Sequence, residues 1–262
     1  MTTARPLGTG TPASPASRGA IILALAANDL RLALRRGESL LVTFVIPVGV
    51  LVLFSAFDLG GADAAGAPAV DRMLPGSITL AIIAASMVSL AIATGFERAY
   101  GVLKRLGGSP AGTTSLVAAR TIGVAVIELV QVALLVGVAA GLLGWSPGPQ
   151  PAPAVVLAAL VLGTVAFAGL GLLMAGTLRA EATLALANLL FLVALVIGGI
   201  VVPLARLPDA VAAVAAVLPP ALLNRLLEIG LGAGGDPTTP LALLAGWAVA
   251  LAALAARTFR WD

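Results

Sequence analysis

Long, nearly uncharged apolar runs constrain this sequence more than any other feature. A helix that crosses a bilayer needs about 20 mainly apolar residues. Charged residues make up only 10% of the whole chain, against about 25% in a soluble domain. The chain has too few charged residues to cover the surface of a water-soluble protein. The sequence therefore predicts an all-α, polytopic membrane protein. Its six expected spans cover about residues 40–57, 74–96, 113–143, 154–178, 182–202 and 241–256.

The start of the chain differs from the rest in composition. Residues 1–19 are rich in Ala, Pro, Thr, Ser and Gly, which is typical of a disordered tail. Residues 20–262 are then expected to form one membrane domain. The apolar stretch 20–27 is short, and Asp29 and Arg31 follow it where a signal peptide would carry small residues. We therefore expect no cleaved signal peptide.

Lysine and arginine are unequally shared between the two sets of connecting segments. Cytoplasmic segments carry an excess of these residues. With a cytoplasmic N-terminus, twelve of the 15 lie on the cytoplasmic side, and only Arg72, Arg206 and Arg225 lie on the other. The sequence therefore predicts that both termini are cytoplasmic.

Two stretches are expected to be helical without crossing the membrane in a simple way. In residues 20–36, Leu23, Ala26 and Leu30 share one helical face, and arginines lie on the other. This pattern is typical of an amphipathic helix at the cytoplasmic leaflet. In residues 203–228, Pro219 and Pro220 interrupt an apolar outer segment. We expect two short helices there, either interfacial or re-entrant.

A third such stretch, FERAYGVLKRLGGSP at 96–110, holds the only lysine of the chain. Its apolar positions recur at helical spacing, and two glycines and a proline end the pattern. We expect a short cytoplasmic helix between the second and third spans.

Several kinds of chemistry are excluded by missing residues. The chain has no cysteine and no histidine, so it has no disulfide, no thiolate metal site and no histidine base. The GxxxxGK[ST] loop that binds nucleotide phosphates needs a lysine after a glycine, but Lys104 follows Leu103. Ser86 and Ser89 lie in an apolar helix without a base nearby in sequence. We therefore predict no enzyme activity, no metal site and no nucleic-acid partner.

Glu128 is the one acid inside an expected span, and Gln131 lies three residues later on the same face. An ionisable residue in lipid is costly and is a functional candidate by default. The pair could line a polar pathway or bond across a subunit interface. Alternatively, Glu128 lies near the cytoplasmic interface or pairs with Gln131 for structural reasons.

Glycines recur in the third and fourth expected spans. Small residues at such spacing let helices pack closely, and we interpret these glycines as packing positions rather than as a ligand site. They are Gly137, Gly141, Gly144, Gly163, Gly169, Gly171 and Gly176.

Four motifs, in order and spacing, resemble the ABC-2 type permeases, the six-span membrane subunits of bacterial ABC exporters such as daunorubicin-resistance-like drug permeases. After Glu97, this chain has Arg98 where members often carry a second acid. The motifs are NDLRLALRRGESLLVTFVIP at 28–47, LPGS at 74–77, FERAYGVLKRLGGSPAGTTSLVAAR at 96–120 and VPLARLPDAVAAVAAVLPP at 202–220.

The resemblance implies a bacterial plasma-membrane complex for multidrug efflux and antibiotic resistance. Two permeases, identical or related, would pair with separate ATPase subunits that bind ATP and Mg²⁺, while this chain binds no cofactor. The segment between the second and third spans would be the coupling helix that docks on the ATPase, and the first helix would be an elbow at the membrane surface. The implied docking residues are Glu97, Arg98, Tyr100, Gly101, Leu103, Lys104 and Arg105, and the implied elbow residues are Asp29, Arg31, Arg35 and Arg36.

The substrate is not defined by any motif. An interior with few polar groups favours a hydrophobic or amphiphilic drug, lipid or peptide, moved out of the cytoplasm. The sequence leaves two alternatives open. One is a secondary carrier or channel that works without ATP, although the two halves show no clear internal repeat. The other is a membrane assembly or immunity protein that transports nothing.

Overall fold

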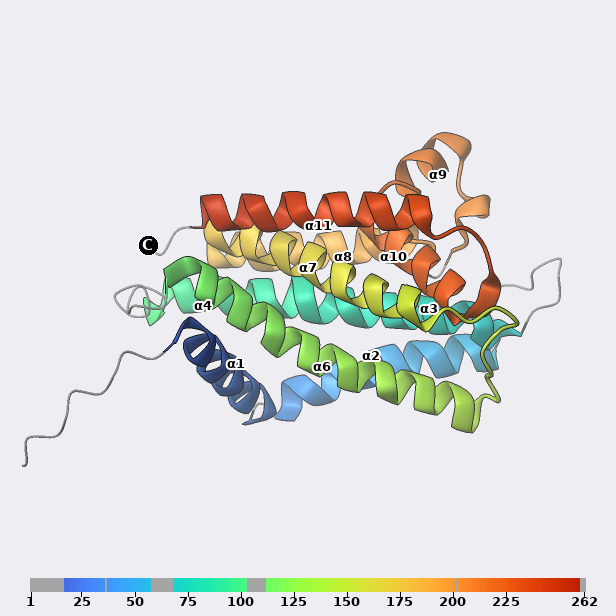
Figure 1. Cartoon of the computed structure of the whole chain (residues 1–262), viewed down its shortest axis with the longest axis horizontal. Helices are drawn as coiled ribbons and strands as arrows, with labels where there is room; N and C mark the ends of the chain where they lie inside the picture. Colours follow the sequence, from blue (N-terminus) through green and yellow to red (C-terminus); the bar gives the residue numbers. More distant parts are fainter. Residues whose placement is uncertain (1–16, 36, 58–67, 103–111, 201, 260–262) are drawn as a thin grey trace, which may run out of the picture.

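The computed structural model describes residues 17–35, 37–57, 68–102, 112–200 and 202–259, and these form helices and no strand. The predicted tail, 1–19, lies almost entirely outside the described residues. The helices lie roughly along one direction, as a bundle (Figure 1). They are α1 (Arg18–Arg35), α2 (Gly37–Ala56), α3 (Ala69–Ile82), η1 (Ile83–Ser89), α4 (Leu90–Ala99), α6 (Gly112–Leu142), α7 (Pro153–Thr177), α8 (Ala180–Ile197), η2 (Leu204–Arg206), α9 (Asp209–Ala215), α10 (Pro219–Glu228), η3 (Ile229–Ala233) and α11 (Thr238–Thr258).

The expected all-α membrane fold is confirmed. Five helices among the described residues are long and apolar enough to cross a membrane, and a sixth candidate is the pair α9 and α10, which is bent by 80°. The helix α2 covers the expected first span, but its described apolar part, Phe44–Ala56, is short for a crossing by itself. The third, fourth and sixth spans match the expected ranges within a few residues, whereas α8 ends at Ile197 rather than near residue 202.

The second span is longer at both ends than the sequence predicts. The helices α3, η1 and α4 join into one helix, Ala69–Ala99, whereas the expected span ended at Phe96. Nothing in Phe96–Ala99 breaks a helix, and the chain turns only at Gly101, whose φ is +72°. A left-handed glycine is a common helix terminator. The boundary prediction was therefore wrong, and Glu97 and Arg98 belong to the second span.

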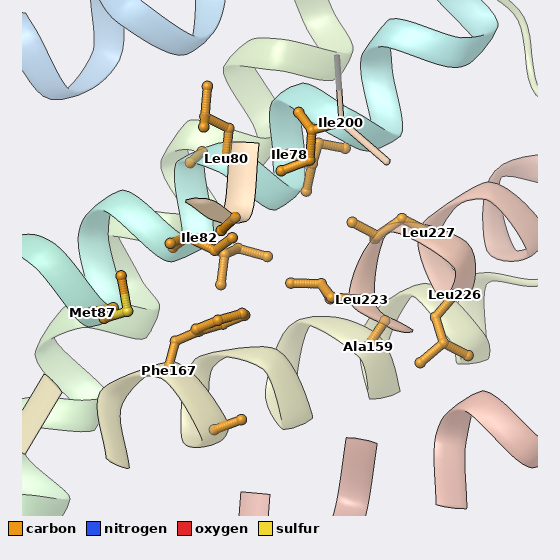
Figure 2. Close-up of a cluster of buried hydrophobic side chains, with 14 of the residues drawn as sticks. Ile78, Leu80, Ile82, Met87, Ala159, Phe167, Ile200, Leu223, Leu226 and Leu227 are labelled. Carbon is orange, nitrogen blue, oxygen red and sulfur yellow. The ribbon is translucent and has the colours of Figure 1, made fainter. Parts of the chain in front are cut away.

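This second span is the centre of the fold, because 72% of its most apolar 18-residue stretch is buried inside the bundle. It packs against α2, α6, α7, α8 and α10. Figure 2 shows Ile78, Ile82 and Met87 of this span facing Phe167 of α7 and Leu223 of α10. The hydrophobic core therefore joins segments from both halves of the chain.

The glycines of α7 lie where other segments approach closely. A Cβ on Gly171 would lie 2.8 Å from the carbonyl oxygen of Met87, and one on Gly169 would lie 2.9 Å from the backbone of Leu251. The packing interpretation holds for these positions. By contrast, Gly137 and Gly141 of α6 have open space where a Cβ would be.

The segment 203–228 forms two different helices, as predicted. Leu223 and Leu227 of α10 are fully buried, whereas Val214 of α9 is 61% exposed. The helix α10 lies within the bundle, and α9 projects at its end (Figure 1). Two bonds fix this segment: Trp247 donates to the Val217 carbonyl at 2.9 Å, and Asn224 donates to the Gly199 carbonyl at 3.3 Å.

Candidate functional site

The two ends of the bundle carry different charges. We call the basic end the one where α4, α7 and α11 finish and α6 and α8 begin, and the hairpin end the one that holds α9 (Figure 1). Apart from Arg31 of α1, the described charges of the basic end are Arg98, Arg120, Arg179 and Arg257 against Glu97 and Glu181. Those of the hairpin end are Arg72, Arg206 and Arg225 against Asp71, Asp209, Glu228 and Asp236.

An ion pair joins the end of the second span to the third span. The guanidinium of Arg120, on α6, pairs with the carboxylate of Glu97, on α4, and a second contact joins Nη1 and Oε1 at 3.4 Å. The Arg120 side chain is 9% exposed and that of Glu97 is 24% exposed. Charges so far from water are tolerated when they are paired. The pair therefore fixes α4 against α6.

The next residue, Arg98, reaches a third helix. Its Nη1 donates a hydrogen bond of 2.7 Å to the carbonyl oxygen of Ala175, in the last turn of α7. Carbonyls in the last turn of a helix lack a partner within the helix, and a cation is favourable there. We call Glu97, Arg98, Arg120 and the Ala175 carbonyl the basic clamp. The clamp holds the ends of α4, α6 and α7 together.

Beyond the clamp, Tyr100 is 75% exposed, and its ring stacks on Phe96 with centroids 6.1 Å apart. Gly101 then turns the chain. Of the expected docking residues, Glu97 and Arg98 bond within the chain, and Tyr100 faces outward. The others, Leu103, Lys104 and Arg105, lie outside the described residues.

The stretch expected to form an amphipathic helix is helical, as α1, and it packs against α6. Ala26 is buried, Leu30 is half-buried, and Arg31 is exposed. Leu23, expected on the apolar face, is 64% exposed. Asp29 and Arg35 lie within α1, but their side chains, and all of Arg36, lie outside the described part of the chain.

Glu128 lies near the middle of α6 and is 4% exposed. The Thr164 hydroxyl, on α7, donates a hydrogen bond to its Oε2, and the Ser86 hydroxyl, on η1, lies beside the same carboxyl group. Gln131, one turn further along α6, is also buried. Glu128 therefore contacts two other segments of its own chain.

Three residues that contact Glu97 or Glu128 were not predicted from the sequence to do so. Arg120 appeared only as one of many cytoplasmic cations, and Ser86 only as a serine without a base. Thr164 gave no signal, because it lies 36 residues from Glu128. Ser86 also lies in a π-helical turn, a feature that often marks functional sites.

The sequence profile described as "ABC-2 type transporter" matches residues 21–230, which is well over half of the chain. The chain belongs to the ABC-2 type transporter family. No curated protein matches it in sequence. Members of this family are membrane components that typically pair with a separate ATP-binding subunit, so this permease is a membrane transport subunit of an ABC system.

Proposed function

We propose that this ABC-2 permease is an exporter subunit that receives movement at its basic end from a separate ATPase. The observation that carries the proposal is the basic clamp. It lies directly before the segment that joins the second and third spans, and it bonds the end of the second span to two further helices.

The docking surface comprises Tyr100 and the residues that follow it. Exposed tyrosines are frequent anchors in protein interfaces, and Lys104 and Arg105 supply cations that pair with acids on a partner. Leu103 adds an apolar side chain for a pocket. Gly101 turns the chain directly after Tyr100.

The clamp provides a path for the movement. A displacement of the docking segment acts on α6 through Glu97 and Arg120, and on α7 through the bond between Arg98 and Ala175. Packed helices move as rigid elements during such transitions. The spans would therefore shift together when the ATPase pair closes on ATP.

The charge difference between the ends supports the orientation. Among the described side chains outside α1, the basic end has four arginines against two acids, and the hairpin end has three arginines against four acids. Arginine excess marks the cytoplasmic side. We place the basic end and both termini in the cytoplasm of a bacterium, with the permease in its plasma membrane and the hairpin end outward.

The helix α1 serves as the elbow in this arrangement. It packs along α6 and exposes Arg31 toward solvent or lipid headgroups. Asp29, Arg35 and Arg36 complete its polar side in sequence. Such a helix anchors the start of the membrane domain at the cytoplasmic leaflet.

The proposed arrangement also indicates the energy source and the class of transported substrate. The partner ATPase would bind ATP and Mg²⁺, since this chain has no phosphate-binding loop of the GxxxxGK[ST] kind. Two permeases, identical or related, would pair to form the pathway. The low polarity of the spans supports export of a hydrophobic or amphiphilic drug, lipid or peptide, and thereby multidrug efflux and antibiotic resistance.

Charge reversal in the docking segment tests the proposal. The permease is co-expressed with an ATPase encoded beside it and purified through a tag. The double variant Lys104→Glu and Arg105→Glu should lose most of the co-purified ATPase. Arg206→Glu, an exposed charge at the hairpin end, is the control and should retain it.

Equal recovery of the ATPase with both variants would contradict the docking surface. Transport by the purified permease without any ATPase would instead favour a secondary carrier or channel. An intact complex that moves no substrate would favour an assembly or immunity protein.

A further inference from the structure

The carboxyl group of Glu128 has fewer hydrogen bonds than a buried anion needs. The residue is 4% exposed in the middle of α6. Its Oε2 accepts a bond from Thr164, whereas its Oε1 is buried and has no hydrogen-bond partner among the described residues. An ionised carboxylate offers about four lone-pair positions to donors. Burial of such a charge is costly unless it is paired and well bonded.

The two hydroxyls beside this carboxyl group supply few protons to it. A hydroxyl has one proton to donate. Ser86 donates its proton to the Ile82 carbonyl of its own helix, so its oxygen is left to accept. The single proton of Thr164 lies between Glu128 and the Leu160 carbonyl, whose oxygen is 2.8 Å from Oγ1. The carboxyl group therefore receives at most one bond from the two hydroxyls.

No described cation lies beside Glu128 to balance a negative charge. The elements that supply the two hydroxyls, η1 and α7, contain no charged residue. The only other charged residue of α6 is Arg120, eight residues earlier, which pairs with Glu97.

The remaining helices that pack against α6 are α1, α2, α3 and α11. Their charged residues lie at the ends of the bundle, on its outside or beyond the described side chains. Asp71 and Arg72 are at the hairpin end, Arg257 is at the basic end, Arg31 is exposed, and the side chains of Arg18, Asp29, Arg35 and Glu38 are not among those described.

The helices around the site approach one another closely. A Cβ on Gly171 of α7 would lie 2.8 Å from the carbonyl oxygen of Met87 and 3.1 Å from that of Ser86. The π-helical turn of η1 thus presses against α7 at the level of the Ser86 hydroxyl. A proton is the one positive charge that adds no volume to such a contact.

We propose that Glu128 is a proton-binding site: Oε1 holds a proton at neutral pH and offers it to the Ser86 oxygen, so that the packing of α6 on η1 and α7 depends on this proton. The neutral acid removes the buried charge and leaves Oε2 to accept the bond from Thr164. An ionised Glu128 would instead need water or a cation between the helices. This site goes beyond the proposed export function, because it involves neither a partner chain nor a substrate.

Infrared spectroscopy of the full-length permease in lipid vesicles tests the protonation directly. A protonated carboxylic acid has a carbonyl stretching band that an ionised carboxylate lacks. At pH 7 the wild type should show this band, and Glu128→Gln should lose it. Glu181→Gln, the same change at an exposed acid at the start of α8, is the matched control and should retain it.

Isotope labelling keeps the test independent of any substitution. Wild-type permease produced with carbon-13 in its glutamate carboxyl groups should show the same band at lower frequency. A band that does not move belongs to an aspartate and would contradict the assignment.

The pH dependence of unfolding in detergent is the second measurement. An exposed glutamate ionises near pH 4.3, or about that value, so unfolding between pH 6 and pH 8 would release the proton of Glu128. The unfolding temperature of the wild type should therefore fall as pH rises. Glu128→Gln has no such proton and should show a flatter curve, and Glu181→Gln should follow the wild type.

Three results would overturn the inference. One is the absence of an acid band in the wild type at pH 7, and another is a band that persists in Glu128→Gln. The third is an unfolding temperature that rises with Na⁺ in the wild type and not in Glu128→Gln, since the balancing charge would then be a metal ion. None of these measurements needs the ATPase, so their failure leaves the docking proposal standing.

Discussion

The two ends of this bundle use charge differently. At the basic end, Glu97 and Arg98 bond to two other helices, at Arg120 and Ala175. At the hairpin end, the pair of Arg225 and Glu228 lies within a single helix, three residues apart, with Nη1 and Oε2 at 3.1 Å.

This difference separates a mechanical link from a local bond. Removal of one partner of a buried ion pair costs about 3–5 kcal/mol, while an exposed pair contributes about 0–1 kcal/mol. The basic end therefore can hold three spans in one unit, whereas the pair of Arg225 and Glu228 lies within one turn of α10. Packing and the bonds from Trp247 and Asn224 to backbone carbonyls hold the helices of the hairpin end.

The largest loss of unfolding free energy is expected on substitution of Arg120. Arg120→Gln leaves the Glu97 carboxylate partly buried without its cation and should lower the unfolding free energy by about 3 kcal/mol or more. Arg225→Gln at the hairpin end should cost at most about 1 kcal/mol. Thermal unfolding in detergent measures both. Equal losses would erase the contrast between the ends.

The second-largest loss of unfolding free energy is expected at Thr164, which contacts Glu128 between the two ends of the bundle. Thr164→Val removes the donor to the buried carboxyl group of Glu128 and should cost about 1–3 kcal/mol. The matched control is Thr177→Val on the same helix, where the exposed hydroxyl bonds only to the Leu173 carbonyl; its effect should stay within about 0.5 kcal/mol. Thermal unfolding measures both, and similar shifts would show that the carboxyl group does not need this donor.

Function at Glu128 is separable from this structural contact. Glu128→Gln keeps an oxygen that accepts the Thr164 bond, so it should cost less stability than Thr164→Val. Unchanged transport and assembly in this variant would remove Glu128 as a functional site and leave it as a packing element.

The smallest effect is expected at Asp236, before α11. The hydroxyl and the backbone N–H of Thr238 both bond to its Oδ1, and these bonds lower the pKa of the Asp236 carboxyl below its usual value. Because the folded pKa is lowered, the stabilisation is present above the unfolded pKa of about 3.9 and is lost as pH falls through the folded value. Unfolding temperatures between pH 5 and 3 should show a weaker pH dependence for Asp236→Asn. An unchanged slope would contradict this assignment.

Much of the fold could be predicted because lipid imposes a simple rule on the sequence. Apolar length alone located most spans, and the prolines at 219 and 220 located the break between α9 and α10. The end of the second span was misjudged, because the charges of Glu97 and Arg98 look like a loop when their partners are unknown. Those partners lie on other helices and leave no local pattern.

The candidate sites were predictable only as residue types. Glu128 stands out in an apolar run, yet its inward orientation depends on Thr164 and Ser86 from distant segments. Periodicity cannot give this orientation, because α6 is apolar on nearly every face.

Arg98→Met tests the central claim most directly, because it removes the bond to α7 and leaves the docking segment unchanged. In lipid vesicles that contain the permease and its ATPase, the complex should form normally. Substrate moved per ATP should fall several-fold, because the bond that joins α4 to α7 is lost. Transport at the wild-type ratio would contradict the claim that the basic clamp carries the movement of the ATPase into the spans.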